Sequence, residues 1–200
     1  MRRAGPLAAH DDVLELAVEQ GGAEELRAAL DAQFAPVDLL VADHAPTVPR
    51  LFVSDMDSTM ISAECIDELA DFAGLKEQIA AITERAMQGE LDFAEALTER
   101  VRLLGGLDAA AIRQCLDERI APMPGARVLV ETLKEQGCHT VLVTGGFHQF
   151  ADPVAEELGF QQVVANRLAV EQGRLTGGLE GSIVDSSVKE AVLRESSARL

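Results

Sequence analysis

The chain has 200 residues, of which 48% are hydrophobic and 26% are charged, so it can bury one sizeable core and a smaller appendage. Its 17 Lys and Arg residues stand against 34 Asp and Glu residues, which gives a net charge of -17. Such a field repels nucleic acid and anionic membranes, so we expect neither as a partner.

No apolar run approaches the roughly 20 residues needed to cross a bilayer, and the first ten residues lack the apolar stretch of a signal peptide. The three cysteines, Cys65, Cys115 and Cys138, lie far apart and have no CxxC neighbour. They predict reduced thiols in a cytoplasmic protein rather than a disulfide framework or a zinc site.

Residues 1–48 predict a small N-terminal α/β segment without a chemical motif. Helical spacing of Val, Leu and Ala predicts helices over 11–20 and 23–33, separated by two glycines. Residues 37–41 predict a short strand, and residues 43–49, which include two prolines, predict a linker.

Residues 51–54 predict a strand that runs directly into two carboxylates, Asp55 and Asp57, and then two hydroxyls. Charge held at the end of a buried strand is costly unless it binds a metal or attacks a substrate. On this pattern alone, an Asp/Ser turn stabilised by local hydrogen bonds remains equally open.

A run of helices follows and predicts a four-helix cap over residues 63–122, inserted between two parts of a core at 49–62 and 123–200. Asp92 and Asp108 stand where helix N-caps are expected. The helices are predicted from apolar residues at three- and four-residue steps over 64–72, 75–87, 93–104 and 108–118.

The remaining elements alternate between helix and strand, which predicts an α/β core with a parallel sheet. A hairpin is expected around residues 171–173, and Pro153 is expected to mark a second helix start. The predicted helices cover 126–135, 147–158 and 186–200, and the predicted strands cover 139–143, 162–165, 168–170 and 174–176.

Polar residues follow two of the strands, and ligands of open parallel sheets bind beyond the carboxyl ends of the strands. Thr144 offers a hydroxyl, and Gly145 allows its backbone N–H to approach an anion, although Thr-Gly-Gly alone also fits a simple strand-to-helix turn. Lys189, near the start of the last helix, taken alone fits a solvated surface lysine. Together with Asp55, these residues supply a nucleophile, donors and a cation suited to phosphoryl transfer.

The ordered set resembles motifs I, II and III of the haloacid dehalogenase (HAD) superfamily, with 55–59, 144–146 and Lys189 in those places. Within that superfamily, segments 64–70, 86–93 and 100–107 resemble the cap of phosphoserine phosphatases, as do 165–168 and 175–178. The resemblance covers about residues 48–200. It implies a HAD-like Rossmannoid parallel sheet with an inserted four-helix-bundle cap.

The resemblance also implies a reaction: Mg²⁺-dependent hydrolysis of a small-molecule substrate, O-phospho-L-serine, to L-serine and phosphate, in L-serine biosynthesis. Asp55 is the implied nucleophile that forms an aspartyl phosphate, and Asp57 the implied proton donor and acceptor, with a pKa raised by the nearby acid. Asp55 and the Asp57 carbonyl are the implied metal ligands. Thr144, Gly145 and Lys189 are implied to hold the phosphoryl oxygens, with Thr144 standing where many members have Ser.

The resemblance assigns substrate selection to the cap, with Glu64 on the ammonium and Arg100 on the carboxylate of phosphoserine. Either residue taken alone also fits an exposed helix charge. Met87 and Phe93 are expected to line an apolar wall, or else to pack in the core.

The family's fourth motif, a GDGxxD-like turn that carries a third metal-binding acid, occurs nowhere in the 200 residues. We therefore expect a chain truncated before that motif, with a sheet that is incomplete at its C-terminus. Two alternatives stay open: an inactive fragment that lacks the third acid, and a HAD phosphatase for another small phosphate ester.

Overall fold

The computed structural model describes residues 4–10, 13–18, 22–34, 36, 38–42, 44 and 47–200. Contacts divide the chain into two compact units, Met1–Thr47 and Val48–Leu200. Within the described residues, no helix is both long and apolar enough to cross a membrane.

The first unit contains two antiparallel strands, β1 (Ala4–His10) and β2 (Val13–Val18), and one helix, α1 (Ala23–Phe34). The helix predicted over 23–33 is confirmed. The helix predicted over 11–20 is wrong where β2 lies, because its short apolar run fits a period of two as well as a helical one, and pairing with β1 decides between them. The strand predicted over 37–41 is also wrong at 38–41, which lie in no strand, while residue 37 lies outside the described residues.

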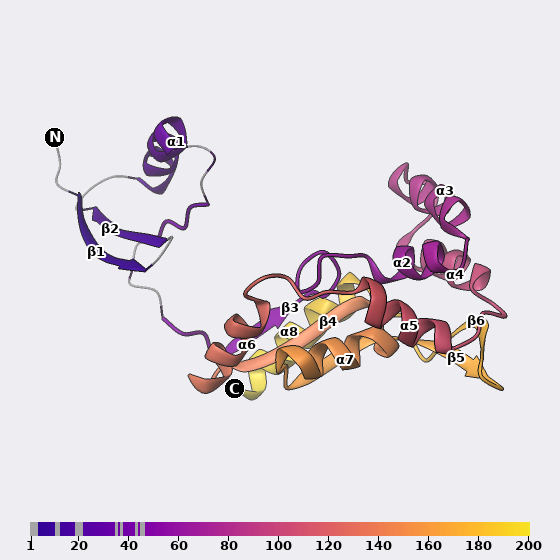
Figure 1. The fold of residues 1–200 in the computed structure, drawn as a ribbon. Helices are drawn as coiled ribbons and strands as arrows, with labels where there is room; N and C mark the ends of the chain where they lie inside the picture. The colour runs from indigo at the N-terminus through magenta and orange to yellow at the C-terminus, as the bar shows by residue number, and fades with distance from the viewer. Residues whose placement is uncertain are drawn as a thin grey trace. The chain divides into compact units, whose positions relative to one another are not determined.

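The second unit is built on a four-stranded sheet in the order β3-β4-β5-β6 (Figure 1). The strands are β3 (Leu51–Ser54), β4 (His139–Phe147), β5 (Gln162–Glu171) and β6 (Arg174–Glu180). The first three run parallel, and β6 returns antiparallel to β5. Among the described strands β3 has a neighbour on one side only, so Asp55 and Asp57 follow an edge strand.

Helices cover both faces of this sheet. Successive side chains along β4 point to opposite faces and are apolar on both, so each face needs a covering layer. Leu142 faces the cluster that includes α6 (Ala126–Glu135) and α7 (His148–Leu158). Val141 and Val143 face the opposite cluster, against which α8 (Ser186–Arg199) packs. The α/β fold predicted from the sequence is confirmed, and the carboxyl ends of β3 and β4 lie side by side.

The inserted cap consists of α2 (Cys65–Phe72), α3 (Lys76–Met87), α4 (Phe93–Leu103) and α5 (Ala110–Arg119). All four predicted helices are confirmed to within a few residues. Asp92 forms the predicted N-cap in a full capping box with Glu95. At α5 the N-cap is Ala109, and the Asp108 carboxylate accepts the Ala110 N–H at 2.9 Å.

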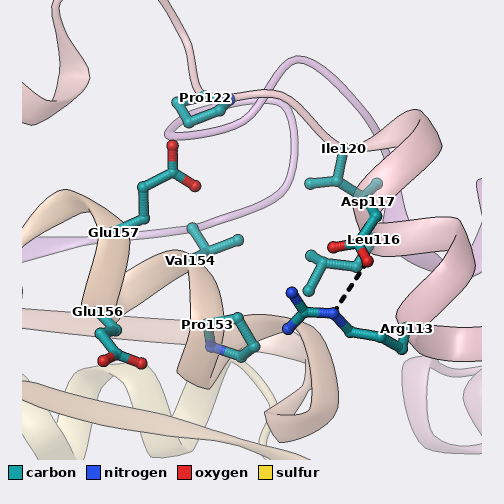
Figure 2. Close-up of a pocket in the computed structure, with 9 residues that line it drawn as sticks. All are labelled: Arg113, Leu116, Asp117, Ile120, Pro122, Pro153, Val154, Glu156 and Glu157. Atoms are coloured by element: carbon teal, nitrogen blue, oxygen red, sulfur yellow. Dashed lines mark hydrogen bonds and ion pairs between the residues drawn. The ribbon is translucent and has the colours of Figure 1, made fainter.

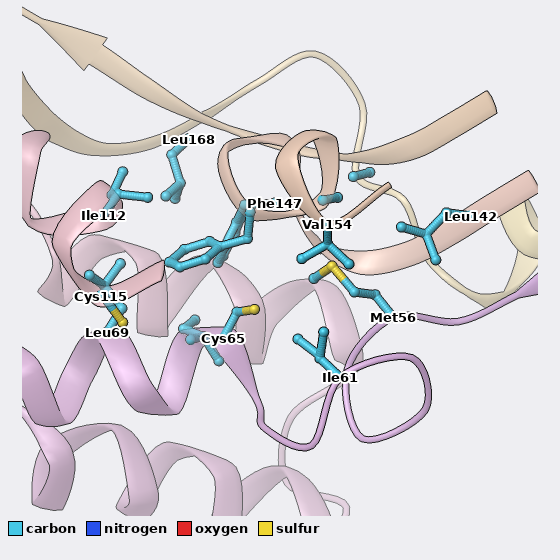
Figure 3. Close-up of a cluster of buried hydrophobic side chains, with 14 of the residues drawn as sticks. Met56, Ile61, Cys65, Leu69, Ile112, Cys115, Leu142, Phe147, Val154 and Leu168 are labelled. Atoms are coloured by element: carbon cyan, nitrogen blue, oxygen red, sulfur yellow. The ribbon is translucent and has the colours of Figure 1, made fainter. Parts of the chain in front are cut away.

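One buried cluster joins the base of the cap to the sheet (Figure 3). Cys65 and Leu69 of α2 and Cys115 of α5 are buried with Met56 and Phe147 of the core. Full burial of a large apolar side chain contributes about 1.5–3 kcal/mol to stability. The shared cluster therefore fixes α2 and α5 firmly to the core.

Two predicted element limits are wrong for identifiable reasons. Pro153 lies inside a continuous α7 rather than at a second start, because the helix buries Phe150, Val154 and Leu158 and this packing outweighs one missing N–H. Strand β4 continues to Phe147 through a register shift between Val143 and Phe147, so Thr-Gly-Gly is a bulge within a strand rather than a turn.

Candidate active site

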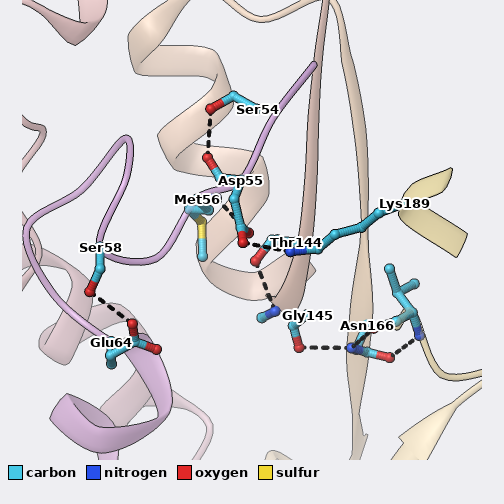
Figure 4. Close-up of polar contacts among 11 residues, drawn as sticks. Ser54, Asp55, Met56, Ser58, Glu64, Thr144, Gly145, Asn166 and Lys189 are labelled. Carbon is cyan, nitrogen blue, oxygen red and sulfur yellow. Dashed lines mark hydrogen bonds and ion pairs between the residues drawn. The ribbon is translucent and has the colours of Figure 1, made fainter. Parts of the chain in front are cut away.

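Asp55 and Asp57 flank Met56, whose fully buried side chain anchors the segment after β3. One Asp55 oxygen, Oδ1, accepts the Met56 N–H at 2.9 Å. The other, Oδ2, accepts a hydrogen bond from Lys189 Nζ at 2.5 Å (Figure 4). The Asp55 side chain keeps 42% of its surface exposed, so it is held in place and is still open to a substrate.

The Asp57 carboxyl group lies deeper, where Oδ1 accepts the Cys65 N–H at 3.0 Å. Burial is the main cause that raises the pKa of Asp57 above its ordinary value, and the charges of Glu64 and Asp55 add to it. The predicted direction is confirmed, but the neighbouring acid is the smaller cause. A carboxyl group that is protonated more readily than usual is suited to donate a proton.

The bulge in β4 brings the backbone close to Asp57 and to Phe93 of the cap. A Cβ atom on Gly146 would lie 2.8 Å from Asp57 Oδ2, and one on Gly145 would lie 2.8 Å from Phe93 Cζ. The hydroxyl of the buried Thr144 accepts the Gly146 N–H at 2.9 Å. A side chain at either position would therefore displace a residue of the site, Phe93 for Gly145 and Asp57 for Gly146, so glycine keeps the bulge close to them.

Lys189 reaches Asp55 from α8. Asp185 caps this helix by accepting the backbone N–H groups of Ser187 and Val188. This N-cap at Asp185 fixes the first turn of α8 and therefore the base of the Lys189 side chain. Lys189 is thus a positioned cation rather than the solvated lysine that the sequence left open.

Two charged cap residues face these core residues. Glu64 Oε1 accepts a hydrogen bond from Ser58 Oγ at 2.8 Å, and Ser58 adopts a positive φ of 51°, a conformation uncommon for residues other than glycine. Burial lowers the pKa of Arg100, while Asp67 and Glu64 act in the opposite direction. Both residues are held by the structure instead of extending freely into water.

All seven predicted site residues line one pocket of about 180 Å³: Asp55, Asp57, Glu64, Arg100, Thr144, Gly145 and Lys189. Phe93 lines it too, as expected. Met87 does not line this pocket and does not pack in the core, since it is 85% exposed. The pocket is therefore shared between core and cap, and Phe93 and Leu97 of α4 form part of its apolar wall.

Sequence reasoning gave no role to Asn166, which is 2% exposed. Its side-chain amide donates to Gly145 O at 2.8 Å and to Val184 O at 3.4 Å, and its Oδ1 accepts the Val184 N–H at 2.8 Å. Asn166 thereby joins the Gly145 bulge to the segment that precedes α8. A polar amide within an apolar strand was the available signal, because such groups are buried only with partners.

A larger pocket of about 430 Å³ lies between α5 and α7 (Figure 2). Leu116 and Val154 form part of its apolar surface, and the Arg113–Asp117 ion pair, 3.0 Å long, stands at its edge. None of the predicted site residues lines it. The larger cavity is therefore not the candidate active site.

A metal ion would find oxygen ligands at the Asp55 carboxylate and at the Asp57 backbone carbonyl, on one side of the pocket. Across the described part of the chain, no group of three or more His, Cys, Asp or Glu residues is arranged to hold a metal. One or two carboxylates completed by substrate oxygens and water are nevertheless a common donor set for Mg²⁺. The residues present therefore fit a Mg²⁺ ion that is bound together with a phosphate group.

The two acids after β3 share one pocket with the helical cap, an arrangement that suits a hydrolase. The family model for haloacid dehalogenase-like hydrolase matches residues 52–200. The chain belongs to this family.

Among curated relatives, the phosphoserine phosphatase of Archaeoglobus fulgidus is 48% identical over 146 residues, which are 73% of this chain and 42% of that protein. The phosphoserine phosphatase of Streptomyces coelicolor is 41% identical over 189 residues, 92% of this chain and 46% of that protein. The chain thus spans less than half the length of these two relatives.

A solved structure of a phospho-aspartyl intermediate analogue of phosphoserine phosphatase superposes with a TM-score of 0.69 and 35% identity. The match covers 76% of this chain and 73% of that one. The similarity therefore extends over the cap as well as the sheet.

Proposed function

We propose that the chain catalyses the hydrolysis of O-phospho-L-serine to L-serine and phosphate. One observation carries the proposal: a single pocket brings Asp55, Thr144 and Lys189 of the core opposite Glu64 and Arg100 of the cap. The names of the relatives, phosphoserine phosphatases at 48% and 41% identity, support the same substrate.

In the first step, an Asp55 carboxylate oxygen attacks the phosphorus atom. The new O–P bond forms as the bond from phosphorus to the serine oxygen breaks, and the proton of Asp57 goes to that leaving oxygen. Lys189 donates to Asp55 at 2.5 Å, so its charge offsets the repulsion between this carboxylate and an anionic phosphoryl group. Thr144 and the Gly145 N–H are the donors for the phosphoryl oxygens.

In the second step, water attacks the phosphorus atom of the aspartyl phosphate. Asp57, now a carboxylate, takes a proton from that water, and the bond between phosphorus and the Asp55 oxygen breaks. Phosphate leaves, and both acids return to their starting forms. Dividing the reaction in this way replaces one difficult displacement with two easier ones.

The proposed cofactor is Mg²⁺, held by the Asp55 carboxylate and the Asp57 carbonyl. When bound, it would neutralise part of the charge on the phosphoryl oxygens. The two acids already lie on one short segment after β3, which supports this assignment.

Selection of the substrate is assigned to the cap. Phosphoserine carries an ammonium and a carboxylate beside its phosphate, and Glu64 and Arg100 are the complementary charges that line the pocket. Arg100 is partly desolvated, which strengthens its attraction for a carboxylate.

The proposal includes two expectations about setting: L-serine biosynthesis, which the family resemblance implies, and the cytoplasm, which the cysteine usage implies. Cys65, Cys115 and Cys138 are buried free thiols, which agrees with a reducing compartment.

Phosphate release from O-phospho-L-serine, measured with and without Mg²⁺, tests the proposal. We expect Glu64→Gln and Arg100→Lys to raise KM about tenfold or more, with little effect on p-nitrophenyl phosphate, which lacks both charged groups. Glu77→Gln on the exposed surface of α3 is the matched control.

Two results would favour the alternatives. Turnover of other phosphate esters that is insensitive to Glu64 and Arg100 would indicate another small substrate. No phosphate release from either compound would favour the other alternative, an inactive fragment in which Asp55 and Asp57 do not suffice for turnover.

A further inference from the structure

The β5–β6 hairpin contacts the cap through the loop that follows α4 (Figure 1). The Gly106 N–H donates to Leu175 O at 2.8 Å, and the Leu175 N–H donates to Leu107 O at 2.9 Å. The Ala109 N–H donates to Gly173 O at 2.9 Å. These bonds extend the hairpin by a short ladder into the cap, at a place separate from the chain connections at either end of the insertion.

A side chain strengthens the same contact. Arg174 donates through one terminal nitrogen to Gly106 O at 2.7 Å, and its backbone forms an isolated bridge with Asp108. We call residues 105–109 and 173–177 the clasp. Three of its hydrogen bonds join backbone groups of the two segments. Because backbone hydrogen bonds are directional, the clasp fixes the loop after α4 in one position on the hairpin.

Two glycines allow the clasp to close. A Cβ atom on Gly105 would lie 3.2 Å from Arg102 O and 3.4 Å from Thr176 O. A Cβ atom on Gly177 would lie 3.1 Å from Arg102 O and 3.3 Å from Gly105 Cα. The end of α4 and strand β6 therefore approach so closely that an added methyl group would force a neighbouring group to shift by a few tenths of an ångström.

Helix α4 connects the clasp to the pocket. Its 11 residues span about 16 Å, and Phe93, Leu97 and Arg100 along it line the pocket. Arg100 lies in the last turn of α4, which ends at Leu103 shortly before the clasp, and its Nε donates to Ala96 O at 3.2 Å within the helix. A shift at the C-terminal end of α4 would therefore displace the Arg100 guanidinium.

We propose that the clasp is a positioning element for substrate selection: it holds α4 so that Arg100 meets the substrate carboxylate. The hairpin thus contributes to specificity although it supplies no residue to the pocket. This inference rests on the function proposed above.

The test is Gly105→Ala, which adds one methyl group at the contact without requiring a positive φ. We expect KM for O-phospho-L-serine to rise about tenfold, since small misplacements of binding groups are costly, while turnover of p-nitrophenyl phosphate stays unchanged. Arg174→Ala, which removes a bond and adds no atoms, is the milder second variant and should shift KM in the same direction.

One control lies in the same hairpin, just outside the clasp. An added Cβ atom on Gly178 would touch only Thr176 Oγ1, at 3.4 Å, so Gly178→Ala should leave KM unchanged. An equal loss with both substrates, or an unchanged KM in Gly105→Ala and Arg174→Ala, would overturn the inference.

Amide hydrogen exchange gives a readout that does not depend on activity. In Gly105→Ala we expect faster exchange at Gly106 and Leu175, and also along α4 at Leu97 and Arg100. If the unaltered chain hydrolyses neither compound, the proposed function fails, and exchange alone decides on the clasp. Faster exchange at the clasp with unchanged exchange along α4 would contradict the inference.

Discussion

Asp57 combines a catalytic assignment with a cost to stability. Burial raises its pKa, so the folded state binds its proton more tightly than the unfolded state does. Stability is then lost as the pH rises from about 4 through the folded pKa, because the charged form is disfavoured inside the protein. The same property that suits Asp57 to proton transfer therefore opposes folding at neutral pH.

We predict that Asp57→Asn raises the melting temperature at pH 7 and that this gain disappears below about pH 4. The same variant should lose phosphate release by about 10²-fold or more, because the proton donor is gone. Thermal melts across a pH series and a phosphate assay measure the two effects. Asp117→Asn, on the exposed surface of α5, is the control, and a gain that does not vary with pH would contradict the assignment.

Asn166 is expected to act through the groups it joins. Asn166→Ala leaves Gly145 O and the Val184 N–H without this partner, which should lower the free energy of unfolding by about 2–4 kcal/mol. It should also reduce phosphate release, because Gly145 and the segment before Lys189 lose their connection.

Gln149→Ala is the matched comparison for Asn166→Ala. Gln149 makes two similar bonds to Leu168, at 2.8 Å and 3.2 Å, away from the pocket. Urea unfolding should show a loss of stability for both variants, whereas kcat should fall only for Asn166→Ala. Equal effects on kcat would show that Asn166 has no special connection to the site.

For single residues, the sequence indicates which side chains lie together when several motifs follow in order. Asp55 and Lys189 each had a second interpretation alone, but the ordered set placed them in one site, and both line the same pocket; their roles in the reaction remain a proposal. Ser58 and Asn166 act on Glu64 and Gly145 through contacts made only in the folded chain. No spacing along the sequence reports such a contact, so residues of this kind were missed.

Among the elements, α4 depends on its N-cap as well as on the clasp. The Glu95 N–H donates to Asp92 Oδ1 at 2.8 Å, and the Asp92 N–H donates to Glu95 Oε2 at 2.9 Å. This reciprocal pair gives a partner to two backbone N–H groups, those of Asp92 and Glu95, at the start of the helix.

We predict that Asp92→Ala lowers the free energy of unfolding by about 1 kcal/mol, and that Asp92→Asn restores most of it. Urea denaturation of the three proteins makes the comparison. If Asp92→Asn were as unstable as Asp92→Ala, the capping bond would not be the source of the stability.

Elements could be predicted where apolar periodicity is long and ends are marked. Helices α2 to α6 meet both conditions, and the cap was predicted well from them. Strand β2 was not predicted. Val13–Val18 is too short for its apolar pattern to distinguish a strand from a helix, and its partner β1 was not expected. The continuous α7 depends on buried side chains around Pro153, which local sequence rules do not include.

At the scale of the whole molecule, all the predicted site residues lie in the unit Val48–Leu200. The domain limits predicted from the sequence, at 1–48, 49–62 with 123–200, and 63–122, remain a proposal. They imply that the N-terminal unit contributes nothing to the pocket.

A chain of residues 48–200 should therefore melt within about 2 °C of the same unit in the full chain and keep its activity within about twofold. Calorimetry and a phosphate assay on both chains make the comparison. A large loss in either quantity would mean that residues before Val48 support the site.

The proposed reaction depends above all on the attack of Asp55 on phosphorus in O-phospho-L-serine. The most direct test is to mix the chain with Mg²⁺ and this substrate, quench in acid, and locate the added phosphoryl group by peptide mass spectrometry. We expect one phosphoryl group on Asp55 and none in Asp55→Asn. Phosphate release without any label on Asp55, or a label that persists in Asp55→Asn, would contradict this role of Asp55.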